Sequence, residues 1–268
     1  MISRRPSRSF HEAIALCALN AAMALGLAGC DLAHGRPGPG PEVMRPEEEM
    51  RFAVLYKENC AACHGANGRD GAAISLANPV YVEIAKDHLH DVIAQGVPGH
   101  LMPAFGKNAG GMLTDQQVSA VAQGIVAQWG SPEGLAGQTA PTYTAKLAAS
   151  IEHGQQSYAV FCARCHGTNG AGGAIDEKSP ATLSGSARPG SIVDPSFLAL
   201  LSDQDLRSIL IAGRPDQGMP DWRTDAAQPM TDQQITDIVA WIASKRVADP
   251  GQPYQGRPYP GQPNTTQP

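Results

Sequence analysis

One phrase occurs twice in this chain, and it limits the folds that the chain can adopt. It reads YKENCAACHGANG over residues 56–68 and YAVFCARCHGTNG over residues 158–170, an offset of 102 residues. Further along, an offset of 117 residues aligns Met102 with Met219, together with the residues around them. The chain is therefore two copies of one module, and the second copy has 15 extra residues between its cysteine motif and its methionine.

The repeated phrase contains the pattern C-x-x-C-H. Two thiols at this spacing can form thioethers with the vinyl groups of haem, and the adjacent histidine can ligate the iron. The alternatives are a disulfide, a redox dithiol and a zinc site. Zinc would require the two cysteine pairs to converge on one ion, and a dithiol has no need of the histidine. We expect two covalent c-type haems, held by Cys60, Cys63, His64, Cys162, Cys165 and His166.

A further ligand for each iron is expected among the residues that both modules share. Met102 and Met219 are equivalent, whereas the nearby Met112 and Met230 have no methionine counterpart in the other module. A methionine in a small domain can also be a simple core residue. The other histidines within the two modules are not shared either; they are His88, His90, His100 and His153. His100 remains an alternative ligand at one haem, because ligand identity is what tunes a haem.

The pattern of the chain predicts helices. Apolar residues recur at helical spacing from Leu89 and from Leu206, and each run closes at a glycine that suits a helix C-terminus. The sequence TDQQ at Thr114 and at Thr231 predicts helix starts with a capping box. Entry helices are expected from Pro46 into the first motif and over residues 144–161 into the second. Strand-like alternation is weak, so we predict an all-α fold.

The two ends of the chain predict export and attachment. Residues 1–29 combine basic residues with an apolar run, which is typical of a signal peptide. The run ends in LAGC, which resembles the bacterial lipobox and makes Cys30 a candidate lipidation site; a plain signal peptide or an uncleaved anchor are the alternatives. Residues 30–45 read as a stiff tether and residues 248–268 as a disordered Pro/Gly/Gln-rich tail. Asp31 directly follows Cys30 and resembles the residue that retains some bacterial lipoproteins at the inner membrane. We therefore expect the inner membrane rather than the outer membrane as the site of attachment.

The net charge of the chain limits the kinds of partner that it is expected to bind. The formal net charge of the chain is −5, and removal of the signal peptide would make it more negative. An acidic chain is a poor candidate for nucleic-acid binding, which rewards lysine and arginine patches. A basic surface on a protein partner is the better expectation. No segment reaches the roughly 18 apolar residues of a membrane-spanning helix.

With these residues in view, both modules resemble class I c-type cytochrome domains, and residues 46–247 resemble a membrane-tethered di-haem cytochrome c. The resemblance implies two tandem domains, 46–130 and 144–247, joined by a linker over 131–143. It implies that His64 and His166 are proximal ligands and that Met102 and Met219 are distal ligands. In this family a proline after the motif often presents its carbonyl to the proximal histidine, and the candidates are Pro79 and Pro180.

One departure from the family concerns the crossing of the terminal helices. The family often has glycine there, which the second module has as Gly154, whereas the first module has Phe52. The terminal helices of the first module are therefore expected to pack further apart.

Two like modules with the same ligand pair favour a one-electron carrier over an enzyme. Such a protein would pass electrons between a donor and an acceptor protein on the periplasmic side of a bacterial membrane. The alternatives are a di-haem enzyme, such as a peroxidase or a thiosulfate-oxidising cytochrome, and an electron-transfer subunit of a larger dehydrogenase or oxidase. A peroxidase is disfavoured because both modules offer methionine, and the thiosulfate type because the mature chain would have no spare cysteine to serve as a thiolate ligand.

Overall fold

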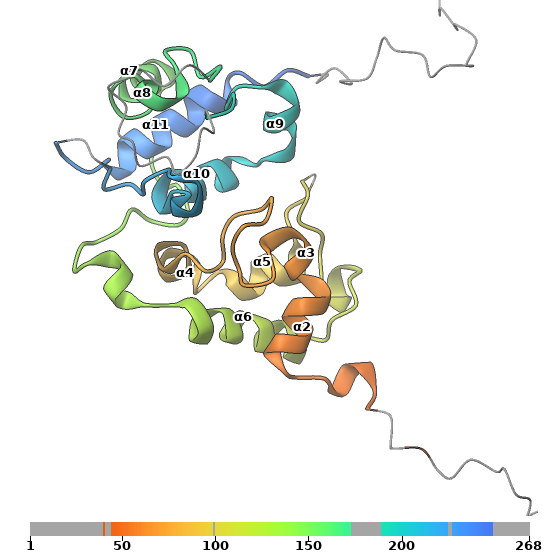
Figure 1. The fold of residues 1–268 in the computed structure, drawn as a ribbon. Helices are drawn as coiled ribbons and strands as arrows, with labels where there is room; N and C mark the ends of the chain where they lie inside the picture. Colours follow the sequence, from red (N-terminus) through yellow and green to blue (C-terminus); the bar gives the residue numbers. More distant parts are fainter. Residues whose placement is uncertain (1–39, 41–43, 99, 173–188, 225–226, 249–268) are drawn as a thin grey trace, which may run out of the picture. The chain divides into compact units, whose positions relative to one another are not determined.

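The computed structural model describes residue 40 and residues 44–98, 100–172, 189–224 and 227–248, and the part from Pro46 onward forms one compact unit. Within these ranges the named secondary-structure elements are all helices, which confirms the all-α prediction (Figure 1). The predicted signal peptide, Cys30, Pro180 and nearly all of the predicted tether and tail lie outside the described residues. Within the described ranges, no helix is both long and apolar enough to cross a membrane.

The first module contains five α-helices and three short 3-10 helices. The α-helices are α2 (Phe52–Asn59), α3 (Ala61–His64), α4 (Pro79–Ala85), α5 (Leu89–Gln95) and α6 (Asp115–Trp129). The 3-10 helices are η1 (Pro46–Glu48), η2 (Lys107–Ala109) and η3 (Pro132–Leu135). The last of these lies within the predicted linker.

The second module repeats this order. Its helices are α7 (Ile151–Phe161), α8 (Ala163–His166), α9 (Pro195–Leu200), α10 (Asp203–Ala212), η4 (Pro215–Gln217) and α11 (Asp232–Ala243). Thus α7 corresponds to α2, α8 to α3, α9 to α4, α10 to α5 and α11 to α6.

The predicted helix starts are confirmed where a capping box defines them. Thr114 Oγ1 accepts from Gln117 N, and the Gln117 side chain accepts in return from Thr114 N. Thr231 and Gln234 repeat this arrangement at the start of α11. Each box satisfies two of the N–H groups that a helix start leaves free.

The two entry helices begin later than the sequence pattern predicts. The helix expected from Pro46 is interrupted after η1, because the Glu49 carboxylate accepts from Arg51 N at 2.8 Å, and α2 begins at Phe52. The second entry helix begins at Ile151, where Ser150 Oγ accepts from His153 N. In the second module the side-chain cap at Ser150 therefore defines the helix start more strongly than the apolar pattern before it.

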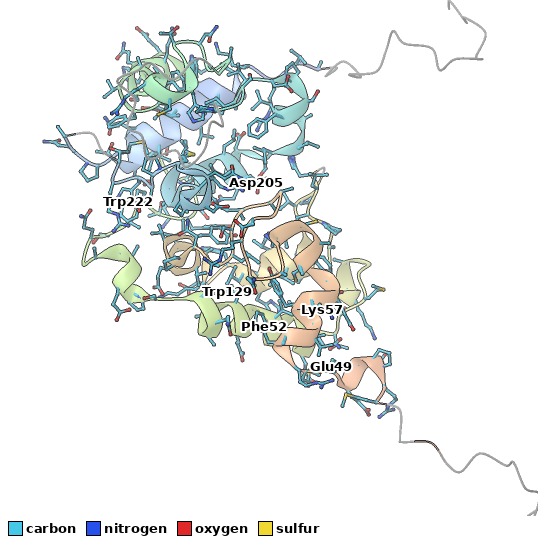
Figure 2. All side chains as sticks on the ribbon, viewed as in Figure 1. Glu49, Phe52, Lys57, Trp129, Asp205 and Trp222 are labelled. Carbon is cyan, nitrogen blue, oxygen red and sulfur yellow. The ribbon has the colours of Figure 1, made fainter. Side chains whose placement is uncertain are left out.

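A glycine lies at the crossing of the terminal helices in both modules, but on opposite helices. In the second module a Cβ at Gly154 on α7 would lie 2.0 Å from Asp237 O of α11. In the first module Phe52 is on the entry helix, and a Cβ at Gly124 on α6 would lie 2.1 Å from its ring. The Phe52 ring also packs edge-on against Trp129 at 5.7 Å between centroids (Figure 2). The space that Phe52 needs is therefore provided by the facing helix.

The modules contact each other within the compact unit. Helix α4 packs against α10, and the buried Asn78 donates its side-chain N–H to Ala212 O at 2.7 Å. Oδ1 of the same Asn78 caps α4, so the amide nitrogen and the amide oxygen of this side chain both make hydrogen bonds. The rings of His88 and Tyr143 stack at 4.6 Å with an interplanar angle of 19°.

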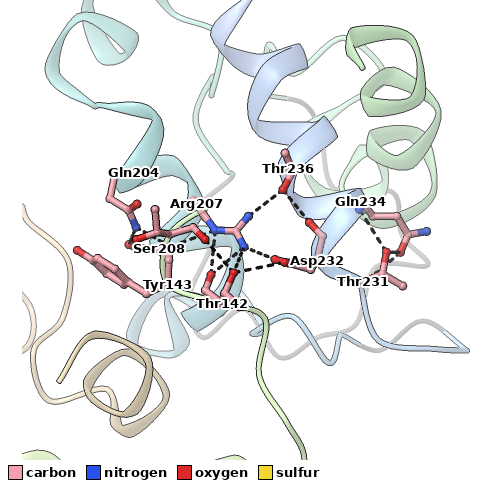
Figure 3. Close-up of polar contacts among 10 residues, drawn as sticks. Thr142, Tyr143, Gln204, Arg207, Ser208, Thr231, Asp232, Gln234 and Thr236 are labelled. Atoms are coloured by element: carbon pink, nitrogen blue, oxygen red, sulfur yellow. Dashed lines mark hydrogen bonds and ion pairs between the residues drawn. The ribbon is translucent and has the colours of Figure 1, made fainter. Parts of the chain in front are cut away.

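A buried arginine holds the end of the linker on the second module (Figure 3). Arg207 is 2% exposed, and it donates to Thr142 O at 2.8 Å and to Tyr143 O at 3.1 Å. Its guanidinium also donates to Thr236 Oγ1 and pairs with Asp232. The linker carbonyls and one carboxylate thus replace the water that a buried charge would lose.

Candidate haem sites

Each C-x-x-C-H motif is a single helical turn that continues the entry helix. Cys60 joins α2 to α3, donating its N–H to Tyr56 O at 2.8 Å and accepting from His64 N at 3.0 Å. The turn stops at Gly65, where φ is +81° and a Cβ would lie 1.7 Å from Arg69 O. Tyr56 Oη donates to Gly65 O at 2.7 Å and holds this end. The motif is therefore fixed at both ends before any cofactor is considered.

The second motif has the same support. Cys162 accepts from His166 N at 2.9 Å, and Gly167 ends the turn with φ of +76°. Tyr158 Oη donates to Gly167 O at 2.7 Å, the distance found in the first module. The duplicated phrase thus encodes a duplicated local structure.

The ring of His64 is oriented by a backbone carbonyl. Its Nδ1 lies 2.8 Å from Ile74 O, so the neutral imidazole donates its proton there and leaves the Nε2 lone pair free. Burial lowers the pKa of His64, and the Ile74 carbonyl acts in the opposite direction. A neutral histidine with a free Nε2 is the form that ligates iron.

His166 is held in a similar setting. Burial lowers its pKa, and the backbone of Gly190 acts in the opposite direction. Gly190 lies 116 residues after Ile74, close to the module offset, so the two residues are equivalent. Nδ1 of His166 is buried and makes no hydrogen bond of ordinary geometry to any residue that the structure describes.

The predicted role of Pro79 is corrected, because the carbonyl that His64 contacts belongs to Ile74. Pro79 instead occupies the first turn of α4, where its missing N–H is harmless and Asn78 provides the cap. The pair Asp194-Pro195 occupies the same positions at the start of α9. The counterpart of Pro79 is therefore Pro195, whereas Pro180 lies outside the described residues.

The first thiol of each motif, at Cys60 and Cys162, packs against the apolar core. Burial, followed by the proximity of Cys63, raises the pKa of Cys60 to about 11. Burial, followed by the proximity of Cys165, raises the pKa of Cys162 to about 12. The four cysteines of the two motifs are free rather than joined by disulfide bonds. An apolar wall beside an unpaired thiol pair suits a porphyrin attached through thioethers.

A glycine allows each methionine loop to return onto the helix before it. Gly96 follows α5 with φ of +65°, and a Cβ there would lie 2.5 Å from Ala104 N and 2.7 Å from Met102 O. Val97 N then donates to Met102 O at 2.9 Å. Only glycine accepts both this φ and this close approach.

The second methionine loop follows the same plan. Gly213 has φ of +67°, and a Cβ there would lie 2.6 Å from Met219 O. Arg214 and Met219 exchange two backbone hydrogen bonds, at 2.9 and 3.0 Å. The buried Trp222 then donates its N–H to Ile211 O, as Phe105 N does to Ile93 O in the first module. Both Met102 and Met219 are partly buried against the core.

The remaining candidates have other surroundings. Met112 is exposed, and Met230 belongs to the core. His90 contacts Asp115, and His88 stacks on Tyr143. His100 differs from these, because its Nδ1 is buried and has no hydrogen-bond partner within the described part of the chain. The alternative that His100 ligates one haem therefore remains open.

The residues present fit a covalently bound haem in each module. Each site combines a paired thiol motif, a histidine with one nitrogen free, and a methionine loop held by glycine. Across the described residues, no group of three or more His, Cys, Asp or Glu side chains is placed to hold a metal ion directly. The donor set is that of a haem rather than of a zinc centre.

Comparison with protein families finds one cytochrome model in each half of the chain. Residues 47–123 match the model described as "Cytochrome C oxidase, cbb3-type, subunit III". Residues 151–246 match the model described as "Cytochrome c". The two matches cover the two modules and leave the linker between them.

Curated relatives include two proteins named "Cbb3-type cytochrome c oxidase subunit CcoP". The protein from Azospirillum sp. (strain B510) is 30% identical over 148 residues, and that from Azospirillum brasilense is 32% identical over 148 residues. Each alignment covers 49% of this chain and 45% of the relative. The chain thus spans less than half the length of the curated relatives that it matches.

A solved structure also aligns with the chain. It is titled "Kuenenia stuttgartiensis reducing HAO-like protein complex Kustc0457/Kustc0458", with 17% identity and a TM-score of 0.42 over 78% of this chain and 100% of that one. A superposition this loose carries no weight for fold or function. The helical fold, the two family matches and the two haem-binding motifs do carry weight, and they make this chain a di-haem c-type cytochrome with two tandem cytochrome c-type domains.

Proposed function

We propose that this protein carries single electrons between redox partners through two His/Met-ligated haems. The observation that supports this most directly is the His64 ring, whose Nδ1 is committed to Ile74 O at 2.8 Å. The free nitrogen is then available for iron, and Met102 on its glycine-held loop is the candidate for the other axial position. His166 and Met219 would form the second pair.

The haem supplies a reversible one-electron change at iron, and methionine ligation raises its potential. The residues of the chain do the rest. The thiols Cys60, Cys63, Cys162 and Cys165 hold the two groups in place. The contact with Ile74 O fixes the orientation of the His64 ring, and the core around each site limits access of water. A haem iron with two protein ligands has no open position for a substrate, and this favours a carrier over an enzyme.

The partner that we propose is a membrane-bound respiratory complex. The similarity to proteins named as oxidase subunits supports this, although it extends over 45% of their length. In that setting the chain would act as an electron-transfer subunit or as a carrier bound to one. We further propose that Cys30 is lipidated and that the protein works on the periplasmic side of the inner membrane.

A second candidate is a di-haem enzyme of the peroxidase type. Nδ1 of His100 favours it, since this atom is buried and has no hydrogen-bond partner among the described residues; His100 precedes Met102 by two positions and has Gln217 as its counterpart. A haem ligated by His100 would differ from its neighbour in potential and in ligand stability.

Electron paramagnetic resonance of the purified ferric holoprotein, read with its visible spectrum, tests these functions. We expect two low-spin haems and the red charge-transfer band of methionine-ligated ferric haem. A high-spin signal, or a low-spin signal from two nitrogen ligands, would contradict the symmetric assignment. In that case, peroxide turnover at the unusual iron becomes the next measurement, and a His100→Gln variant shows whether that residue is the ligand.

The partner is tested separately, by solubilising membranes in mild detergent and isolating the tagged full chain. Recovery of an oxidase or dehydrogenase that reduces or oxidises the haems would support the proposed partner. Recovery of the chain alone, with membranes that cannot exchange electrons with it, would contradict it.

A further inference from the structure

A short segment of the first module, residues 71–74, packs against the first haem motif. A Cβ at Gly71 would lie 2.2 Å from Cys63 O, so the segment passes directly against the motif. Ala73 N donates to Cys63 O at 3.0 Å, and Ile74 O accepts from His64 Nδ1. Residues 71–74 therefore fix both a thiol-bearing residue and the proximal histidine. We call them the bracket.

A residue of the second module reaches this bracket. Arg214 Nη2 donates to Gly71 O at 3.4 Å, a long hydrogen bond from a charged donor. The backbone of the same arginine exchanges two hydrogen bonds with Met219. One residue thus contacts the methionine loop of one candidate site with its backbone and the bracket of the other with its side chain.

The guanidinium of Arg214 is only partly compensated. Its side chain is 14% exposed, and the carboxylate facing it is Asp216, whose Oδ2 lies 3.6 Å from Nη2. Its Nε is buried and has no hydrogen-bond partner within the ranges that the structure describes. Arginine remains charged at any physiological pH. A mostly buried positive charge therefore lies beside the bracket of the first motif.

The charge makes the two sites unequal. The counterpart of Arg214 in the first module is Val97, which has no charge. Reduction adds one electron to a site, and a nearby positive charge favours the reduced state more strongly where water is excluded. The effect of Arg214 falls on the site whose support its side chain touches.

We propose that Arg214 is a positioning residue that ties the two haem sites together and favours the reduced state of the first one. This rests on the proposed electron-carrying function, and it adds which residue biases the distribution of electrons between the modules. Asp216 opposes the effect, because its carboxylate partly neutralises the guanidinium.

The test is a potentiometric titration of the purified holoprotein and its variants. The first haem is identified in a Met102→His variant, whose two-nitrogen low-spin signal marks it. In Arg214→Gln we expect the equilibrium between the haems to shift at least about threefold away from the first, or about 28 mV for a one-electron couple at about 59 mV per tenfold change. Arg214→Lys keeps the charge and should recover most of the shift.

Two further variants separate charge from structure. Arg223→Gln removes a charge that is paired with Asp221 within the second module, and we expect less than half of the shift. Asp216→Asn leaves Arg214 in place and should shift the equilibrium toward the first haem; it also carries the test if Arg214→Gln fails to hold two haems. Haem content and circular dichroism confirm that each variant is folded.

The proposal is overturned if Arg214→Gln changes neither potential, if Arg223→Gln has an equal effect, or if the shift falls on the second haem. Failure of the proposed function has a different signature, which is loss of the methionine band or of low-spin signals from the unmodified protein. The potentials respond to Arg214 or fail to do so whatever the protein's partners are.

Discussion

The methionine loops depend on a glycine, and Gly213→Ala tests that dependence. At Gly213 the backbone has φ of +67° and ψ of −173°, a region that residues with a Cβ avoid at a cost of about 1–3 kcal/mol. The new Cβ would also lie 2.5 Å from the C and O atoms of Pro220, and crowding of this kind costs about 1–3 kcal/mol. Together they destabilise the native loop by about 2–6 kcal/mol. We expect the loop to move and Met219 to leave its position.

The assay is the red charge-transfer band of methionine-ligated ferric haem, followed with denaturant unfolding. Gly213→Ala should remove about half of the band, because the first module keeps its own loop, and Gly96→Ala should remove the other half. Gly110→Ala is the matched control, since φ there is +88° but a Cβ would meet nothing within 4 Å. It should cost only about 1–2 kcal/mol of backbone strain and leave the band intact. A Gly213→Ala protein with an undiminished band and unchanged stability would refute the reasoning.

Three further predictions concern stability and pH. Arg207→Met should destabilise the second module by about 3 kcal/mol, which is near the lower limit for breaking a buried pair because Asp232 is 29% exposed. His90→Ala at the equivalent exposed pair should cost less than about 1 kcal/mol. Denaturant unfolding measures the free energy of unfolding of both variants. Gln117→Ala should cost about 2–4 kcal/mol, because it removes the capping box and two hydrogen bonds to the backbone before α2, while the equivalent glutamine of the second module should cost less. Hydrogen bonds from Arg51 lower the pKa of Glu49 from 4.5 to about 2. This stabilising contact is therefore complete above pH 4.5 and is lost as the pH falls through about 2. A carbon-detected NMR titration should give the lowered pKa of Glu49, and Arg51→Gln should return it toward 4.5.

The sequence predicts those parts of the structure that depend on local patterns. Capping boxes at Thr114 and Thr231, the cysteine turns and the all-α class follow from residues close together in the chain. The glycine after each central helix is also local, and its role in holding the methionine loop follows from the repeat. These features are encoded twice, so each copy supports the interpretation of the other.

The parts that the sequence did not predict depend on backbone atoms or on distant residues. The acceptor for His64 is the carbonyl of Ile74, which any residue type could provide, so no side-chain pattern marks it. A signal was present in the pairs Asn78-Pro79 and Asp194-Pro195, which are 116 residues apart and show that Gly190 is the residue of the second module equivalent to Ile74. The position of the insertion in the second module hid the correspondence.

The crossing of the terminal helices shows why a motif residue can be replaced without loss. Phe52 stands where the second module has Gly154, and helices α2 and α6 approach each other closely along less of their length than α7 and α11 do, as expected for a wider crossing. The facing residues are Gly124 in the first module and Trp241 in the second, so large and small side chains have exchanged helices. Packing conserves the shared volume at a contact rather than the residue on one side.

The residues that break the repeat are the ones that can give an electron relay a direction. His90–Asp115 and Arg207–Asp232 occupy equivalent positions, but the first pair is exposed, whereas in the second pair Arg207 is buried beneath the linker carbonyls. Val97 and Arg214 differ in the same way, with no charge at one methionine loop and a mostly buried charge at the other. Two identical sites would share an electron equally. If both haems have the proposed His/Met ligands, a difference between their potentials must come from the surrounding residues, whose charges do not repeat, rather than from the ligands.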